Sequence, residues 1–151
     1  MQLKIDPQQS GIYRLGARHR MLEWQIRRVR EYIDAHMGTR ILVSDLSHIA
    51  QRSDAHFTRT FKKTFGETPH AYLTRLRLES ASRAMLASNA PLTDIALTCG
   101  FTDHAHLCRL FRRWIGRTPV EWRRDPHNLA RAHGHGTMVS RSLTKDVVSN
   151  P

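Results

Sequence analysis

The sequence repeats itself in two stretches, PLTDIALTCGFTDHAHLCRLFRRWIGRTP at residues 91–119 and LVSDLSHIAQRSDAHFTRTFKKTFGETP at residues 42–69. Corresponding residues lie 50 positions apart from Ala55 onward and 49 apart upstream, so one extra residue enters the second copy near Asp103. Two copies are too few for a solenoid, which needs about three units. The aligned pairs are Asp45 and Asp94, Leu46 and Ile95, Ser53 and Thr102, Ala55 and Ala105, His56 and His106, Arg59 and Arg109, Phe61 and Phe111, Lys62-Lys63 and Arg112-Arg113, Gly66 and Gly116, and Thr68-Pro69 and Thr118-Pro119.

Each copy has the pattern of a helix-turn-helix unit, one near residues 44–66 and one near residues 93–116. A short apolar segment is followed by a turn and then by a longer segment with one apolar face. In the first copy Phe57, Phe61 and Phe65 recur at i, i+4 and i+8, the spacing of a buried helical face. The residues that we expect to cap or end these helices are Ser44, Ser53 and Gly66 in the first copy, and Thr93 and Gly116 in the second.

The segments around the repeat are also helical in pattern. Leu22, Ile26, Val29 and Ile33 predict a first helix over residues 20–37. Thr68-Pro69 opens a long helix to about residue 88, and Thr118-Pro119 opens a short last one. No strand pattern is convincing, so the expected class is all-α with about seven helices.

The expected domain organisation follows from these segments. Residues 1–19 lack sustained periodicity and are expected to form a flexible arm, and residues 126–151 are expected to be disordered. The expected parts of the folded domain at 20–124 are a first subdomain at 20–66, a linker helix at 69–88 and a second subdomain at 92–124.

Composition narrows the possible partners. The formal net charge is +11, from 24 Lys plus Arg against 13 Asp plus Glu, which favours nucleic acid, an anionic membrane or an acidic protein. No run of about 18 apolar residues predicts a membrane span, and no signal peptide is recognised. Two cysteines do not make a disulfide framework, so the cytoplasm is the expected compartment.

On these residues the chain resembles the DNA-binding domain of the AraC/XylS family of bacterial transcription regulators, from about residue 26 to residue 124. The strongest part of the resemblance is the set Ile95-Ala96, Gly100-Phe101-Thr102, Phe111-Arg112-Arg113 and Gly116-Arg117-Thr118-Pro119. The first copy fits through Phe61-Lys62-Lys63 and Gly66-Glu67-Thr68-Pro69. It departs from the family at Gln51 and Arg52, where a turn glycine and an apolar residue are common, so Gln51 must accept the turn's backbone without glycine's freedom.

The resemblance implies a sequence-specific regulator, activation being the family's commoner habit, that binds promoter DNA and RNA polymerase. It also implies that the third and sixth helices enter successive major grooves on one face of the duplex. Such grooves lie roughly 34–36 Å apart, and a 20-residue linker helix spans about 30 Å. Only about 20 residues precede the first helix, so the expectation is a stand-alone, monomeric member located at the nucleoid, or a fragment of a longer effector-sensing regulator. No cofactor, metal or catalytic residue is expected.

Seven residues are candidates for reading bases. If the three phenylalanines face inward, Arg59 faces outward, and it can bind guanine O6 and N7 with two hydrogen bonds. Arg109 repeats that role, His104 can donate to a purine N7, and small side chains can meet a thymine methyl. The candidates are Ala55, Thr58 and Arg59 in the first copy and His104, Ala105, Cys108 and Arg109 in the second.

Six further residues are candidates for phosphate contacts. Lys62, Lys63, Arg112 and Arg113 lie later on the two longer helices, where backbone contact is the simpler expectation. Backbone N–H groups near Ser44 and Thr93 can add contacts at helix starts.

Other interpretations stay open for several residues. Arg59 and Arg109 can instead pair with acidic neighbours, while His56 and His106 are as readily packing or capping residues as readers. Cys99 aligns with Ala50 and is expected in the core, and a redox role for Cys108 is the less favoured alternative. A zinc site at His104, His106 and Cys108 is disfavoured because i, i+2 and i+4 do not share one helix face, and His133 and His135 lack a second ligand pair. An architectural protein without sequence preference and an enzyme are the competing classes.

Overall fold

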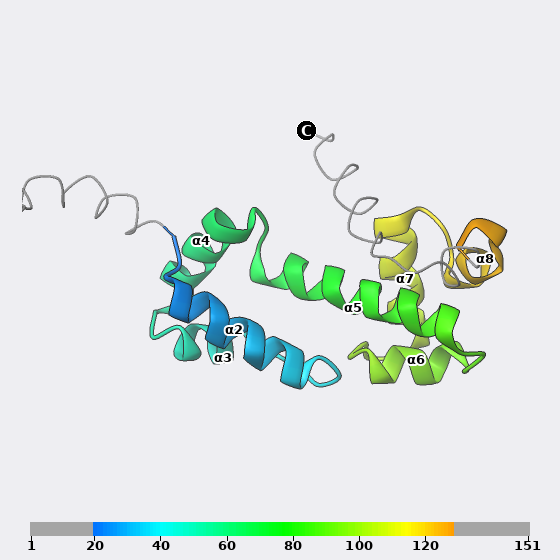
Figure 1. The fold of residues 1–151 in the computed structure, drawn as a ribbon, viewed down its shortest axis with the longest axis horizontal. Coiled ribbons are helices and arrows are strands. Elements are labelled where there is room, and N and C mark those ends of the chain that lie inside the picture. The colour runs from blue at the N-terminus through cyan, green and yellow to red at the C-terminus, as the bar shows by residue number, and fades with distance from the viewer. Residues whose placement is uncertain (1–19, 129–151) are drawn as a thin grey trace, which may run out of the picture. The chain divides into compact units, whose positions relative to one another are not determined.

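The computed structural model describes residues 20–128 of the chain. Seven α-helices and no strand occur in that range, which confirms the all-α class (Figure 1). The expectations for residues 1–19 and for 129–151 lie outside the described residues. The helices are α2 (Glu23–His36), α3 (Val43–Ile49), α4 (Asp54–Phe65), α5 (Pro69–Ala87), α6 (Leu92–Thr98), α7 (His104–Ile115) and α8 (Pro119–Arg124).

The chain divides into two compact units, and the boundary between them falls within α5. Of the described residues, the first unit holds residues 20–35 together with Ile41–Tyr72. The second holds the short segment His36–Arg40 together with residues 73–128. Each unit contains one copy of the repeat.

The core of the first unit is built around α4. Phe57 and Phe61 are fully buried, and the ring of Phe61 lies 4.3 Å from that of Phe65 and 5.3 Å from that of Tyr72, centroid to centroid. Such tilted and edge-on contacts are favourable for aromatic rings. The predicted inward face of α4 is therefore confirmed.

The face that α2 buries differs from the expectation. Its buried residues are Gln25, Val29 and Ile33, whereas Leu22 lies before the helix and is 41% exposed. The buried stripe thus begins with a glutamine, and the physical reason lies in the turn between α3 and α4, which supplies partners for its amide.

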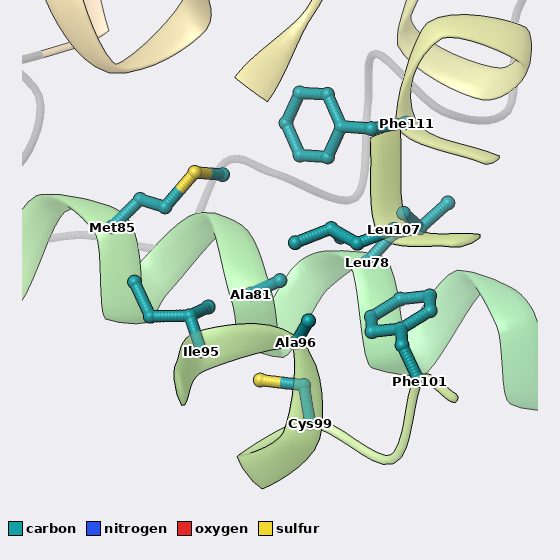
Figure 2. Packing of buried hydrophobic residues seen from close by; sticks show 9 residues of the cluster. All are labelled: Leu78, Ala81, Met85, Ile95, Ala96, Cys99, Phe101, Leu107 and Phe111. Atoms are coloured by element: carbon teal, nitrogen blue, oxygen red, sulfur yellow. The ribbon is translucent and has the colours of Figure 1, made fainter. Parts of the chain in front are cut away.

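The core of the second unit is formed by α5, α6 and α7 (Figure 2). Leu107 of α7 lies beside Leu78 of α5, Phe111 of α7 belongs to the same buried cluster, and Phe101 joins it from the turn between α6 and α7. Cys99 is buried here, as its alignment with Ala50 predicted. The buried cluster consists of Leu78, Ala81, Met85, Ile95, Ala96, Cys99, Phe101, Leu107 and Phe111.

Two of the expected N-caps were wrong. The cap of α3 is Leu42, whose N–H donates to the carboxylate of Asp45 at 3.0 Å, so the helix starts before Ser44. The cap of α6 is Pro91, which has no N–H and leaves Thr93 inside the first turn. In both cases the helix begins upstream of the expected cap, because the carbonyl groups of Leu42 and Pro91 already accept its first backbone hydrogen bonds.

Several other predicted helix ends are confirmed, whereas α2 begins at Glu23 and not at residue 20. Ser53 and Thr118 occupy N-cap positions, and the hydroxyl of Thr118 accepts from the N–H of Glu121 at 3.2 Å. Gly66 and Gly116 end α4 and α7 with φ of 81° and 78°. None of the helices among residues 20–128 is long and apolar enough to cross a bilayer.

Candidate nucleic-acid interface

The two helix-turn-helix units share one backbone turn. The N–H of Arg52 donates to the carbonyl of Ser47, and the N–H of Phe101 donates to that of Ala96, both at 2.9 Å. The residue before each donor has positive φ, 54° at Gln51 and 82° at Gly100. Gln51 therefore does adopt the left-handed conformation that its position in the repeat predicted. The turn donors Arg52 and Phe101 lie 49 positions apart, whereas the N-caps Ser53 and Asp103 lie 50 apart, so the extra residue of the second copy is Thr102 and the expected pairing of Ser53 with Thr102 was wrong.

The side chain that follows the positive-φ residue differs between the copies. Phe101 is 3% exposed and packs into the core of the second unit. Arg52, at the matching place, is half-buried, and its Nε and Nη2 both donate to Oε1 of Gln25 at 3.3 Å. Gln25 is itself 3% exposed and donates from Nε2 to the carbonyl of Ala50 at 2.6 Å. A polar contact thus occupies the place of an apolar one.

The apolar periodicity of α2 did not predict the burial of Gln25, whose amide is satisfied by groups that only the folded turn brings to it. Its Oε1 also accepts from the N–H of Leu22 at 2.9 Å. A buried amide with its partners in place costs far less than an unsatisfied one. The one hint in the sequence is Arg52 itself, which stands where an apolar residue is common in the family and therefore needs a polar partner.

The outer face of α4 carries the three candidate readers of the first copy. Ala55 and Arg59 are exposed, and Thr58 is half-buried. Arg59 forms no salt bridge with any residue that the structure describes. Its guanidinium therefore keeps its five N–H donors available for a ligand outside the chain.

The outer face of α7 is similar. His104, Ala105 and Arg109 are exposed, and Arg109 likewise lacks a salt bridge within residues 20–128. Cys108 is half-buried, with its Sγ 3.3 Å from Nε2 of His104. Burial raises the pKa of the Cys108 thiol, which keeps it in the less nucleophilic, protonated form.

His56 and His106 are both held by the turns that precede their helices. Nη1 of Arg52 contacts Nε2 of His56. Nδ1 of His106 accepts from the N–H of Thr102 at 3.3 Å, and its ring packs edge-on against Phe101 with centroids 5.7 Å apart. Both histidines thus make contacts within their own units, as the packing interpretation expects.

The same geometry separates the three side chains of the disfavoured zinc site. His104 and Cys108 contact each other, whereas His106 turns toward Phe101. Within residues 20–128 no group of three or more metal-ligating side chains is brought together. His133 and His135 lie outside the described residues.

Both longer helices end in exposed basic pairs, Lys62-Lys63 on α4 and Arg112-Arg113 on α7. Cations at this end also favour the helix by facing its free carbonyl groups, so their position has a structural reason as well. In the second unit Glu121 lies near Arg112. The pKa of Glu121 is lowered, first by hydrogen bonds from Thr118 and then by the charges of Arg112 and Arg117.

Ser44 and Thr93 are exposed second residues of α3 and α6. The first N–H groups of a helix lack acceptors within it, so these positions retain the donor property on which the expected phosphate contact rests, although neither residue is the cap.

The sequence of the chain is similar to those of known helix-turn-helix proteins. Residues 46–125, more than half of the chain, match a family described as a helix-turn-helix domain. The chain is 32% identical over 113 residues to the HTH-type transcriptional activator Btr of Bacillus subtilis, a match covering 75% of this chain and 21% of that protein. It spans less than half of the length of seven further curated relatives.

Two solved structures are similar in fold. One is the DNA-binding domain of AdpA, a global transcriptional factor, in complex with a target DNA, with 26% identity, a TM-score of 0.63, and coverage of 68% of this chain and 91% of that one. The other is a transcriptional regulator from Chromobacterium violaceum that is described as one of the AraC-type DNA-binding domain-containing proteins. It has 24% identity and a TM-score of 0.61, and the match covers 68% of this chain and 94% of that one. The second likeness concerns the fold alone.

Proposed function

Because the chain belongs to the AraC/XylS family of helix-turn-helix proteins, we propose that it is a sequence-specific DNA-binding transcription regulator. Its α4 and α7 each enter the major groove, and each reads one segment of a promoter. The role is one of binding, without catalysis.

The observation that carries the proposal is the pair Arg59 and Arg109. They occupy equivalent places on two copies of one unit, both exposed and both without a salt bridge in the described part of the chain. An exposed cation that its own fold leaves unpaired, on the outer face of the second helix of a helix-turn-helix unit, is suited to a guanine edge. Duplication of the arrangement supports two reading events.

The neighbouring candidates complete each reading face. Ala55, Thr58, His104, Ala105 and Cys108 are proposed to meet base edges, with the small side chains against thymine methyl groups and His104 toward a purine N7. The proposed phosphate contacts set the register of the helices without carrying sequence information. Those contacts are Ser44, Lys62, Lys63, Thr93, Arg112 and Arg113.

Selection of bound duplexes from a random pool tests sequence specificity directly. A recovered motif with two separated segments supports the proposal. Retention of no motif would favour architectural binding without sequence preference and would overturn it.

Variants then test the roles of the residues. Arg59→Ala and Arg109→Ala should each relax preference at a different position of the selected motif, with a loss of about 1–3 kcal/mol on the matched duplex. Lys62→Ala is the control, because a phosphate contact should weaken matched and scrambled duplexes alike and reduce the salt slope by about 0.9. Equal losses on both duplexes for Arg109→Ala would refute its reading role.

The wider role is proposed on the same basis. We place the chain in the cytoplasm, at the nucleoid, as a monomeric activator that contacts RNA polymerase. In vitro transcription from a promoter carrying the selected motif measures activation, and sedimentation of the protein with one duplex measures its stoichiometry. A decrease in transcript or a two-to-one complex would contradict these parts without affecting DNA recognition.

A further inference from the structure

The connection between α2 and α3 packs against the turn of the second helix-turn-helix unit. Its segment His36–Arg40 belongs to the second unit, although the residues on both sides of it belong to the first. The segment lies against the turn between α6 and α7, which precedes the proposed second reading helix. The contacts that it makes with Arg77, Thr98 and Gly100 are called the loop contact below.

Two glycines allow the backbones of the segment and the turn to meet. A Cβ added to Gly38 would lie 2.8 Å from the carbonyl oxygen of Thr98, and one added to Gly100 would lie 2.4 Å from that of Met37. Both distances are below 3.0 Å, so neither position accepts a side chain while the loop contact is made. The close approach therefore depends on one glycine in the segment and one in the turn.

The first copy of the repeat shows that the turn itself does not require glycine. Gln51 stands at the place of Gly100 with φ of 54°, and it is exposed. The backbone hydrogen bond that closes the turn is the same in both copies. A residue with a Cβ is thus compatible with this backbone, and the second copy needs glycine because the segment His36–Arg40 covers it.

Arg77 of α5 contacts both the segment and the turn. Its Nη2 donates to the carbonyl of Thr39 at 2.7 Å, and its Nε lies 2.8 Å from the place that a Cβ of Gly100 would take. This Nε is buried without a hydrogen-bond partner, and no salt bridge joins Arg77 to any residue within 20–128. Burial lowers the pKa of the guanidinium, because its charge is partly removed from water.

An arginine in these surroundings is a costly way to fill space. A donor that is buried without an acceptor costs free energy, and an apolar side chain of similar volume avoids that cost. The apolar side chain cannot supply the hydrogen bond to the carbonyl of Thr39, which fixes the segment beside the turn. The position that Arg77 maintains therefore explains its presence better than any stability that it adds.

We propose that Arg77 is a positioning residue for the second reader, because it keeps the segment His36–Arg40 on the turn from which α7 starts. This rests on the proposed DNA-binding function. His104, the first residue of α7 and a proposed base reader, follows Gly100 by four residues. A turn that is free to move lowers the fraction of molecules whose α7 is ready to bind, and the apparent affinity falls by the same factor. Arg77 itself makes no contact with DNA in this proposal.

Binding that is resolved by segment tests the proposal. The selected duplex is titrated beside duplexes scrambled in the segment read by α4 or in the segment read by α7. Arg77→Met keeps an unbranched apolar stem and removes the donor, so preference for the α7 segment should fall about tenfold, the equivalent of one lost hydrogen bond. Preference for the α4 segment should change by less than about threefold.

Three further variants separate the loop contact from the charge. Gly38→Ala adds a methyl group against the carbonyl of Thr98 at a residue without positive φ, so it should lower preference for the α7 segment although Arg77 is intact. Arg77→Lys retains a donor and should recover most of the loss. Arg83, an exposed arginine of the same helix, provides the control, and Arg83→Met should leave both preferences unchanged.

The outcomes that contradict the proposal are specific. Equal losses in both segments for Arg77→Met overturn it, as does a loss in Arg83→Met that matches the one in Arg77→Met. An unchanged preference in Gly38→Ala, or a loss in Arg77→Lys as large as that in Arg77→Met, overturns it as well.

Amide exchange in the chain without DNA distinguishes positioning from a general loss of stability. In Arg77→Met and in Gly38→Ala the N–H groups of Gly100 and Phe101 should exchange faster, because the turn opens locally, while that of Phe111 in the buried cluster stays as slow as in the wild type. Equal acceleration at all three sites overturns the proposal. If no duplex is preferred, the proposed function fails, and exchange still decides whether the loop contact holds the turn. Gly38→Ala decides this alone when Arg77→Met does not fold.

Discussion

Substitution of Gly100 by alanine should destabilise the second unit well beyond the usual cost of a left-handed residue. Gly100 has φ of +82°, and a Cβ there would lie 2.4 Å from the carbonyl oxygen of Met37 and 2.8 Å from Nε of Arg77. Cβ atoms essentially never approach other heavy atoms within 3.0 Å. Either the turn or the segment His36–Arg40 must therefore move.

The magnitude follows from three contributions. The left-handed conformation costs alanine about 1–2 kcal/mol, and the loss of glycine's freedom in the unfolded chain returns about 0.4–1 kcal/mol. Overpacking against a backbone carbonyl adds about 1–3 kcal/mol. Arg77 is also held, because its Nη2 donates to the carbonyl of Thr39 at 2.7 Å. The expected total for Gly100→Ala is about 3 kcal/mol.

Gly116→Ala is the matched control within the same unit. Gly116 has φ of +78°, and a Cβ there would meet nothing within 4 Å, so only the conformational contributions remain, about 1 kcal/mol. Urea unfolding followed by circular dichroism, with amide exchange of α6 and α7 to assign the loss, compares the two variants. A difference below about 0.5 kcal/mol would refute the steric argument.

Three further predictions concern single side chains. Because burial raises the pKa of Cys108, its alkylation by iodoacetamide near neutral pH should be slower in the native chain than in urea, and faster native labelling would contradict this. The pKa of Glu121 is lowered in the fold, so its contribution to the cap of α8 is present above the ordinary glutamate pKa and is lost as the pH falls below about 4.3. Glu121→Gln should therefore flatten the acid dependence of the α8 amide shifts in an NMR titration. An acid dependence that the substitution leaves unchanged would argue against the cap. Gln51→Gly should raise the unfolding free energy of the first unit by up to about 1 kcal/mol, because the relief of left-handed strain exceeds the added freedom of the unfolded chain, and a measurable loss in urea unfolding would contradict the assignment of strain.

The sequence was sufficient to predict the two helix-turn-helix copies and the inward faces of their longer helices. Phe57 and Phe61 are buried, as their spacing predicted. Apolar residues that recur with a period near 3.6 lie on a single face of a helix, and that face packs against the core. The end of each longer helix was equally predictable, because Gly66 and Gly116 supply a left-handed residue without strain. These features depend on neighbours in the chain.

Features that depend on distant partners were less accessible. Ser44 was a reasonable cap by residue type, yet Asp45 reaches back to the N–H of Leu42 and starts α3 earlier. Gln25 broke the apolar pattern of α2, and its burial is acceptable only because the carbonyl of Ala50 receives its amide. Neither partner is visible in a periodicity of apolar residues.

The two turns show why the copies are no longer interchangeable. Their backbones make the same hydrogen bond, but the side chain that enters each unit meets different chemistry: Arg52 meets the amide of Gln25, and Phe101 meets the apolar cluster around Leu107. An arginine in place of Phe101 would place an unpaired charge in that cluster, at a cost of about 3–5 kcal/mol. A phenylalanine in place of Arg52 would leave His56 without its donor. Each turn residue therefore requires its own partners, and any exchange between the copies has to include them.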